Sequence, residues 1–249
     1  MKFNHTLNKQ SPMPLYHQLK DVIIKEISDG NWKPEDMIPT EFEIMDHFNV
    51  SRTTVRQALT DLVKDNLLYR KKGVGTFVAK PKIDLKYIGD DVSINSQIQN
   101  AGMTPHIKII EFTVIDNPAI ELVRALNLSI GDKVIHLLRV RYADDEPIAV
   151  VNSYLPYTLC SFIFNADFEK NSLYQVLATK TETRVISVDR IVEAQLANRQ
   201  DRELMGVEKG FPVQNFASKA YNLDGVVVEY SISRYRSDRN KLFIKIDVK

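Results

Sequence analysis

The chain has 249 residues, a formal net charge of +1 at pH 7, 44% hydrophobic residues and 26% charged residues. These values are ordinary for a soluble globular protein that buries a core. No apolar run approaches the roughly 18–20 residues of a membrane span, and the N-terminal residues lack the apolar core of a signal peptide, so we expect a cytoplasmic protein with no membrane partner.

The length exceeds the commonest domain size of about 100–150 residues, which favours two domains. A single cysteine, Cys160, rules out an internal disulfide, and its position beside Pro156 and Tyr157 is typical of a small buried residue. Five scattered histidines without a second thiol predict no structural zinc site, and we expect neither a metal nor a cofactor.

Charge is unevenly distributed along the chain. Residues 50–82 contain eight lysines and arginines against two aspartates, a local charge of +6. Such a cluster is either a solvated surface or the footprint of a nucleic acid, and its neighbours in the sequence must decide between the two.

Three helices are predicted before this basic segment ends. The first begins at Pro12 and Pro14 and ends at Asp29-Gly30, with apolar residues at helical spacing between them. Thr40 and Glu43 form a capping-box pattern at the start of a short second helix. Ser51 is expected to cap a third helix, whose inward residues are Val55, Ala58, Leu59, Leu62 and Val63.

The start of the third helix presents polar residues away from the core. Arg52, Thr53 and Arg56 lie there, in the position where a helix-turn-helix places base-reading side chains. Arginine can donate two hydrogen bonds to one guanine, and hydroxyls reach phosphate oxygens or base edges. The pattern therefore predicts a recognition helix for duplex DNA.

Residues 67–70 and 76–78 are predicted to form two short strands joined by the turn KKGVG. Taken alone, this segment is an ordinary surface hairpin. After three helices in this order it predicts a wing, whose lysines would lie near phosphates and whose glycines permit a close approach to the groove.

The stretches PLYHQLKDVI, IPTEFEI, VSRTTVRQAL and GVGTFVAKPK resemble the winged-helix domain of GntR-type bacterial transcription regulators. The resemblance implies a DNA-binding domain over residues 1–79. The DNA-binding residues that we predict are Thr40, Ser51, Arg52, Thr53, Thr54, Arg56, Lys71, Lys72, Gly73 and Gly75.

Beyond a polar stretch at 80–92, predicted to be a linker, period-two patterns predict an α+β domain on an antiparallel sheet. The expected strands are His106–Ile115, Lys133–Tyr142, Ile148–Leu155, Arg184–Ala194, Val213–Tyr221, Val226–Arg236 and Lys241–Val248. The expected helices are Ser93–Asn100, Ala119–Leu126, Ser172–Ala178 and Asn198–Met205.

Two strands carry candidate binding residues. Strand alternation puts Arg139 and Arg141 on one face, where two guanidiniums repel unless an anion such as phosphate or carboxylate lies between them. The alternative is an exposed polar face of a half-buried sheet. Glu229 and Tyr235 share a face of another strand, either as ligand contacts or as members of a structural hydrogen-bond network.

The stretches LLRVRYADDEPIAVVNSYLP, NSLYQVL and VEYSISRYRSDR resemble the effector-binding UTRA domain of the HutC subfamily, which is similar in fold to chorismate lyase. The resemblance covers residues 93–249 and implies an effector-binding and dimerisation domain. It implies effector contacts by Ser93, Ile94, Asn95, Arg139, Arg141, Ser172, Tyr174, Glu229 and Tyr235.

One position departs from the members that sense amino-sugar phosphates. They carry a glutamate that contacts the sugar where this chain has Val151. The resemblance therefore does not by itself imply an amino-sugar phosphate, and a different phosphorylated sugar, a sugar conjugate or another small organic anion stands beside it as the expected effector.

The combined expectation is a homodimeric repressor that leaves a palindromic operator when a small anionic effector binds. One rival is a DNA-binding dimer whose second domain senses a non-phosphorylated acid or serves only for dimerisation. The other rival is an enzyme, and no recognisable set of acid, base and nucleophile supports it.

The wing and the second helix also depart from the family pattern, and this yields a first prediction. Phe42 and Val74 stand where the family usually has base-reading arginines. We expect an operator with weakened preference at the positions that those arginines would contact. Selection of bound sequences from a random pool tests this, and recovery of the family's usual half-site at full strength would contradict it.

Overall fold

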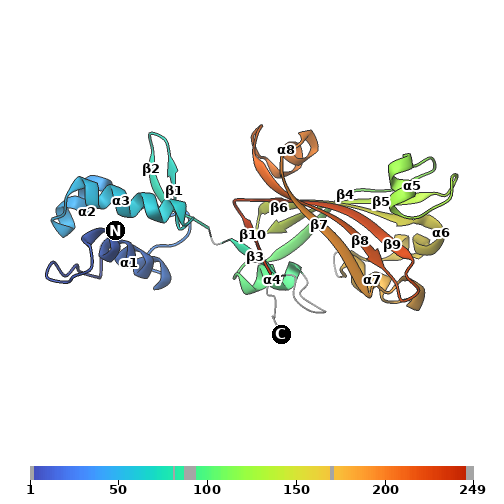
Figure 1. The fold of residues 1–249 in the computed structure, drawn as a ribbon, viewed down its shortest axis with the longest axis horizontal. Coiled ribbons are helices and arrows are strands. Elements are labelled where there is room, and N and C mark those ends of the chain that lie inside the picture. The colour runs from blue at the N-terminus through green and yellow to red at the C-terminus, as the bar shows by residue number, and fades with distance from the viewer. Residues whose placement is uncertain (1–2, 81, 87–93, 169–170, 245–249) are drawn as a thin grey trace. The chain divides into compact units, whose positions relative to one another are not determined.

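The structure is a computed structural model that describes residues 3–80, 82–86, 94–168 and 171–244. The chain forms two compact units that divide between Pro81 and Lys82 (Figure 1). The first unit is mainly helical, and the second is built on a sheet.

The first unit is a winged helix-turn-helix, as the sequence predicts. Its elements are α1 (Leu15–Ser28), α2 (Glu41–Phe48), α3 (Arg52–Lys64), β1 (Leu68–Lys71) and β2 (Gly75–Val78). Thr40 and Glu43 make the complete capping box of α2, which ends at Asn49 in the left-handed conformation with φ 47°. The Ser51 hydroxyl accepts from the backbone N–H of Thr54 and so caps α3.

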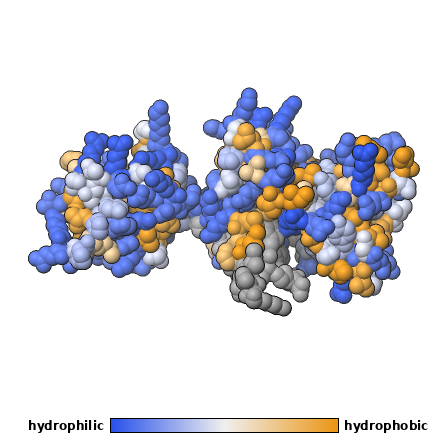
Figure 2. Space-filling view, in the orientation of Figure 1, coloured by the Kyte–Doolittle hydropathy of each residue, from blue (hydrophilic) through white to orange (hydrophobic). Residues whose placement is uncertain are grey.

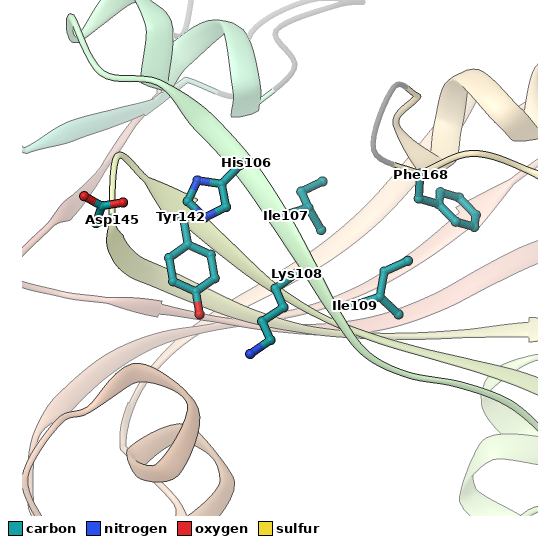
Figure 3. Close-up of a pocket in the computed structure, with 7 residues that line it drawn as sticks. All are labelled: His106, Ile107, Lys108, Ile109, Tyr142, Asp145 and Phe168. Carbon is teal, nitrogen blue, oxygen red and sulfur yellow. The ribbon is translucent and has the colours of Figure 1, made fainter.

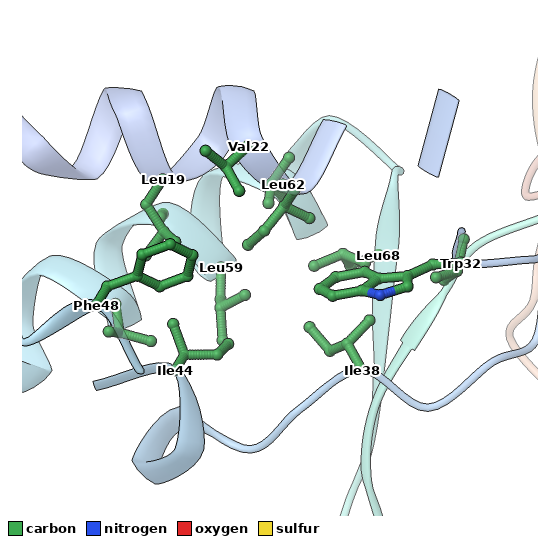
Figure 4. Close-up of a cluster of buried hydrophobic side chains, with 13 residues drawn as sticks. Leu19, Val22, Trp32, Ile38, Ile44, Phe48, Leu59, Leu62 and Leu68 are labelled. Carbon is green, nitrogen blue, oxygen red and sulfur yellow. The ribbon is translucent and has the colours of Figure 1, made fainter. Parts of the chain in front are cut away.

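A single apolar core holds the helices and the wing of this unit together (Figure 4). Leu59 of α3 lies between Phe48 of α2 and Leu62, and the indole of Trp32 packs close to Leu68 of β1. Because α3 contributes its whole inner face to this core, the opposite face is left to solvent. The core therefore fixes which side chains of α3 point outward.

The second unit contains a six-stranded antiparallel sheet with strand order β4-β5-β6-β9-β8-β7. The sheet consists of β4 (Pro105–Ile115), β5 (Val134–Ala143), β6 (Glu146–Pro156), β7 (Ser187–Leu196), β8 (Pro212–Tyr221) and β9 (Val227–Arg236). Two further strands of the unit, β3 (Ile83–Lys86) and β10 (Asn240–Phe243), form a separate two-stranded sheet. Its helices are α4 (Ile94–Asn100), α5 (Ile120–Ala125), α6 (Tyr157–Cys160), α7 (Leu173–Leu177) and α8 (Arg199–Met205), with 3-10 turns at Ser161–Asn165 and Thr181–Thr183.

Two apolar clusters lie on one face of this sheet. A cluster that includes Ile135, Leu155 and Leu173 joins the sheet to α7. A second cluster that includes Ile98, Ala149 and Tyr235 joins it to α4. On the opposite face, α8 packs through Met205 on Leu138 and its neighbours. The middle of the first face, between the two clusters, is where the polar residues of interest lie.

The interval predicted as a linker is only partly one. Residues 83–86 form β3, which pairs in parallel with β10, and residues 87–93 lie outside the described part of the chain. Sequence patterns do not reveal this pairing, because the two strands are far apart in the chain and each is four residues long. The predicted strand at 241–248 is shortened correspondingly: β10 ends at Phe243, and residues 245–249 are not described.

Candidate functional site

The outer face of α3 carries exposed cationic and hydroxyl side chains. Arg52, Thr53 and Arg56 are all exposed. The guanidinium of Arg52 lies 3.5 Å from the Glu41 carboxylate at the start of α2, and both groups remain reachable from solvent. An exposed ion pair of this kind contributes little to stability, so Arg52 can exchange Glu41 for a DNA acceptor at small cost.

Three predicted DNA-binding residues make structural contacts in the free protein. Ser51 Oγ lies 2.9 Å from Thr54 Oγ1, and the Thr40 hydroxyl donates to the Glu43 carboxylate at 2.7 Å. These contacts order the starts of the two helices of the helix-turn-helix. Both helix starts present backbone N–H groups, which favour a phosphate nearby.

The wing places its basic residues around a tight turn. Gly73 has a φ of +74°, a conformation that favours glycine, and a side chain at Gly75 would meet Met37 Sδ at 3.0 Å. Lys71 Nζ lies 4.8 Å from the centre of the Phe77 ring, while Lys72 is exposed. The glycines thus set the shape of the wing, and the side chain of Lys72 extends into solvent.

The residues that replace the family's arginines are exposed. Phe42 on α2 is 75% exposed, and Val74 at the tip of the wing is 66% exposed. Neither side chain packs in the core, so both are available to the groove. Apolar side chains there can contact a thymine methyl group but cannot donate to guanine.

In the second unit, Arg139 is a buried guanidinium. It is 2% exposed, its Nη2 donates to Ser153 Oγ at 2.7 Å, and its buried Nε has no hydrogen-bond partner. The interpretation of an exposed polar face is therefore wrong for Arg139. A buried cation whose near partner is a neutral hydroxyl has a strong demand for an anion.

Arg141 lies two residues along the same strand and faces the same way. Its Nη1 donates to Asn95 Oδ1 of α4 at 3.3 Å, and its Nε is also buried without a partner. Burial and the neighbouring charge of Arg141 lower the pKa of Arg139 to about 10, while Glu229 acts in the opposite direction. Arg139 therefore remains cationic at neutral pH.

Glu229 of β9 lies on the same face and is buried. The Tyr174 hydroxyl donates to its carboxylate, and burial together with the charge of Glu229 raises the pKa of Tyr174 well above its usual value. Tyr235 is also buried, with its ring edge-on to Phe216 at 5.1 Å. The structure thus brings Arg139, Tyr174 and Glu229 into one electrostatic cluster.

The remaining predicted effector residues lie at the margins of this cluster. Ser172 caps α7, where its hydroxyl accepts from the backbone N–H of Gln175 at 3.2 Å. Ile94 is half-buried against the cluster of α4. Ser93 lies outside the described residues. Val151 is buried on the same face, directly opposite Arg139 in the strand register.

Three serines and one arginine of this face were not predicted. Ser153, Ser231 and Ser218 are directly opposite one another on β6, β9 and β8, and Arg190 continues the row on β7. All three serines are buried. No signal in the sequence identifies the row, because it exists only through the register of four strands whose spatial order differs from their order in the chain.

A hollow of about 590 Å³ lies against the outer edge of the sheet at β4 (Figure 3). Its lining includes Ile107, Ile109 and Phe168, and none of the predicted effector residues. Ile107 and Ile109 are the register partners of Arg141 and Arg139. The hollow is therefore next to the arginine pair but is not itself the polar cluster.

Other chemistry is weakly represented in the described part of the chain. Cys160 is fully buried, and burial raises the pKa of its thiol to about 12, so it is a poor nucleophile. The described residues contain no group of three or more side chains placed to hold a metal ion. Among the described helices, none has the length and apolar character needed to cross a membrane.

Comparison with known proteins decides the family. Residues 15–78 match the family described as bacterial regulatory proteins, gntR family, and residues 100–241 match the UTRA domain. The chain belongs to the GntR family of DNA-binding transcription regulators, in the HutC subfamily.

Relatives match over nearly the whole chain. The HTH-type transcriptional repressor NagR of Bacillus subtilis (strain 168) is 34% identical over 94% of this chain and 95% of its own length. The mannosyl-D-glycerate transport/metabolism system repressor MngR of Escherichia coli (strain K12) is 30% identical over 92% and 94%. The crystal structure of PhnF from Mycobacterium smegmatis shares the fold, with a TM-score of 0.67 at 23% identity over 95% of this chain and 100% of the PhnF chain. These relatives are regulators and not enzymes.

The cost of burying Arg139 yields a second prediction. Arg139→Met replaces the guanidinium by an apolar side chain of similar length and removes its desolvation cost, while Tyr174 remains hydrogen-bonded to Glu229. We expect a smaller loss of unfolding free energy than the roughly 3–5 kcal/mol that follows removal of one partner of a well-paired buried ion pair. Denaturant unfolding followed by circular dichroism measures the change.

Arg234→Met is the matched control. Arg234 lies 3.2 Å from the carboxylate of Asp201, which is fully buried on the other face of the sheet. Its removal leaves Asp201 without a cation, so we expect a loss of about 3–5 kcal/mol. Equal losses for the two variants would show that Arg139 is an ordinary structural partner.

Proposed function

We propose that the protein is a homodimeric repressor that binds a palindromic operator and releases it when a small anionic effector binds the second unit. The observation that carries this proposal is the buried guanidinium of Arg139, whose Nε has no partner and which lies beside a second arginine. Such a repressor acts on the chromosome, which places it in the bacterial cytoplasm.

A phosphorylated sugar or sugar conjugate suits the polar cluster best. Guanidiniums bind phosphate through paired, charge-assisted hydrogen bonds, and they supply the anionic end of the site. Glu229 and Tyr174 are suited to sugar hydroxyls, because one accepts and the other both donates and accepts. Among the relatives are repressors of mannosyl-D-glycerate and fructoselysine utilisation.

Two observations argue against assigning an amino-sugar phosphate as the effector. Val151 offers no acceptor for an amine or amide beside Arg139. A histidine utilization repressor of Pseudomonas putida is 29% identical over 82% of this chain, which leaves a non-phosphorylated organic acid as the second candidate. Both candidates use the same arginine pair.

The described contacts provide a route from the effector site to the strand that follows the DNA-binding unit. Asn95, which accepts from Arg141, lies on α4. Ile98 of the same helix packs in one cluster with Ile83 of β3 and Tyr235 of β9. An anion that draws Arg141 away from Asn95 would therefore change the packing of α4 against β3, which is the first strand after Pro81.

The size of the required effect can be bounded. A shift from 1:99 to 99:1 between the DNA-binding and released states requires about 10⁴-fold tighter effector binding to the released state, or about 5.5 kcal/mol. Hydrogen bonds to charged groups contribute about 1.5–3 kcal/mol each. Two or three such bonds that form only in the released state are sufficient.

For the homodimer we propose the edge strand β7 as the contact between sensor units. β7 pairs with β8 on one side only and is exposed along almost its whole length. It carries Val188, Ile191, Val192 and Leu196 as exposed apolar side chains, and Figure 2 shows apolar patches on the hydrophilic surface of this unit. Two copies of such a strand are self-complementary about a twofold axis.

A third prediction separates the two sites. Arg52→Ala or Arg56→Ala should abolish specific operator binding in a fluorescence anisotropy titration, because each removes a base or phosphate contact. Both variants should still respond to a sugar-phosphate panel in a thermal-shift assay. Arg139→Ala should bind the operator and stay bound at any effector concentration. Normal release of this variant would show that the anion site lies elsewhere.

A fourth prediction concerns the dimer. Ile191 is 66% exposed, and Ile191→Glu would put two carboxylates into the proposed twofold contact. We expect a monomer by light scattering and operator binding weakened at least tenfold, because the two half-sites are no longer linked. Ile110→Glu on β4, the other edge strand, is the control and should remain dimeric. A dimeric Ile191→Glu protein would exclude β7 as the contact.

A further inference from the structure

The described residues that precede α1 are fixed to the first unit. The ring of Phe3 lies 5.2 Å from that of Trp32, edge-on. The backbone N–H of Asn4 donates to a carboxylate oxygen of Glu26 at 2.6 Å, and the ring Nδ1 of His5 lies 2.9 Å from the same oxygen. Glu26 is fully buried in the last turn of α1. These contacts anchor the start of the segment beside the end of α1.

Gln18 of α1 holds the turn that follows this anchor. Its Oε1 accepts from the backbone N–H of Asn8 at 2.8 Å, and its Nε2 donates to the carbonyl of Asn8 at 3.0 Å and to that of Met13 at 2.7 Å. The backbone N–H of Ser11 also donates to the Asn8 carbonyl, at 3.2 Å. One side-chain amide thus fixes residues 8–13, which form the N-terminal turn.

Lys9 extends from the N-terminal turn to the junction of α2 and α3. Its Nζ donates to the carbonyl of Asn49 at 3.0 Å, although the two residues are 40 positions apart in the chain. Asn49 ends α2, and Ser51, two residues later, caps α3. The exposed ammonium of Lys9 therefore lies next to the start of the proposed recognition helix.

The Lys9 ammonium can bind a phosphate without leaving Asn49. An ammonium group has three N–H donors, and the Asn49 carbonyl accepts one of them. Among the described carboxylates, none lies within ion-pair distance of Lys9, so its charge is not neutralised by a neighbour. Because the carbonyl already orders the long side chain, less conformational entropy is lost when DNA binds.

The other groups at this junction favour the same ligand. Ser51 and Thr54 present hydroxyl oxygens 2.9 Å apart at the start of α3, and Arg52 beside them is exposed. Ammonium, hydroxyl and guanidinium groups all donate to phosphate, and about half to two-thirds of protein–DNA hydrogen bonds go to phosphate and sugar oxygens. Lys9 therefore extends the basic surface of α3 with a residue that lies far from it in the chain.

We infer that Lys9 is a phosphate-contacting residue of the DNA interface and that Gln18 is the positioning residue that holds it there. The N-terminal turn is then a contact to the DNA backbone in addition to α3 and the wing. It contributes affinity without sequence preference, because phosphate contacts carry no base information. This inference rests on the proposed operator binding through α3, since that binding brings a phosphate to the Asn49 junction.

The salt dependence of DNA binding tests the phosphate contact. Fluorescence anisotropy of the full-length protein is measured between about 50 and 200 mM salt, with a duplex selected from a random pool and with a scrambled duplex. Lys9→Gln should reduce the slope of log K against log salt by about 0.9 for each half-site bound. It should weaken both duplexes by the same factor, while Lys9→Arg keeps the charge and the slope.

Two outcomes would overturn the role of Lys9. An unchanged slope in Lys9→Gln would show that the lysine only ties the N-terminal turn to Asn49. A loss confined to the selected duplex would show a contact to bases in place of phosphate. Lys25→Gln is the matched control, because Lys25 is an exposed lysine in the last turn of α1, and its slope should equal that of the unmodified protein.

A double-mutant cycle tests the role of Gln18. If Gln18 acts through Lys9, Gln18→Ala should lower the slope as Lys9→Gln does, and the double variant should bind no more weakly than Lys9→Gln alone. Additive losses, or a loss of affinity with an unchanged slope, would overturn the positioning role. Thermal unfolding followed by circular dichroism verifies that each variant is folded at the temperature of the titration.

Arg52→Ala separates this inference from the proposed function on which it rests. If Arg52→Ala abolishes the preference for the selected duplex while Lys9→Gln leaves the slope unchanged, only the contact by the N-terminal turn is wrong. If neither variant changes binding to either duplex, the proposed operator binding through α3 is wrong as well.

Discussion

The guanidinium of Arg139, enclosed between two apolar clusters of one sheet, sets the physical constraint on the sensor unit. Removal of a cation from water costs several kcal/mol after relaxation, and the hydroxyl of Ser153 recovers only part of that cost. Glu229 adds a favourable charge but already accepts from Tyr174. In the ligand-free site the desolvation cost of Arg139 is therefore only partly compensated, and a bound anion can compensate the rest. Sequences selected for stability alone would place an apolar residue at this position.

The sheet topology explains why apolar side chains do not close over Arg139. The apolar cluster of α7 lies on one side of the polar row and the cluster of α4 lies on the other. Each cluster has its own packing, so neither can collapse over the arginines without breaking contacts of its own. The α4 cluster also contains Ile83 of β3. Arg141 donates to Asn95 of α4, so the polar face contacts the helix that packs with β3, the described strand nearest in the chain to the DNA-binding unit.

Local signals in the sequence were sufficient to predict the helices and strands but not to predict the candidate effector site. Capping patterns at Thr40 and Ser51 and the period-two strands predicted most helices and strands to within a few residues, because these features depend on neighbours in the chain. Alternation also placed Arg139 and Arg141 on one face. The burial of Arg139 could not be read in this way, since it depends on which strands flank β5 and what packs above them.

The same limit applies to the residues that sequence reasoning missed. Ser153 and Ser231 are adjacent in space because β9 follows β6 in the sheet, although 70 residues separate the two strands in the chain. Arg190 lies on a strand whose residues are nearly all exposed, so nothing in its local pattern distinguishes it from a solvated arginine. A binding site assembled from the register of a mixed-order sheet is a tertiary property, and a single sequence specifies it only through the whole fold.

Arginine is used in opposite environments in the two units: it is exposed on α3 and buried in the sheet of the second unit. On α3, Arg52 remains hydrated and its pair with Glu41 is weak, so DNA phosphates and bases can replace Glu41 with little loss. In the sensor, Arg139 is dehydrated, so each hydrogen bond to an incoming anion is made in a low-dielectric site where water no longer competes. Exposure suits a reader that must sample many sequences quickly. Burial suits a sensor that must convert the binding of one small molecule into several kcal/mol of differential free energy, which is the quantity that limits any ligand-driven switch.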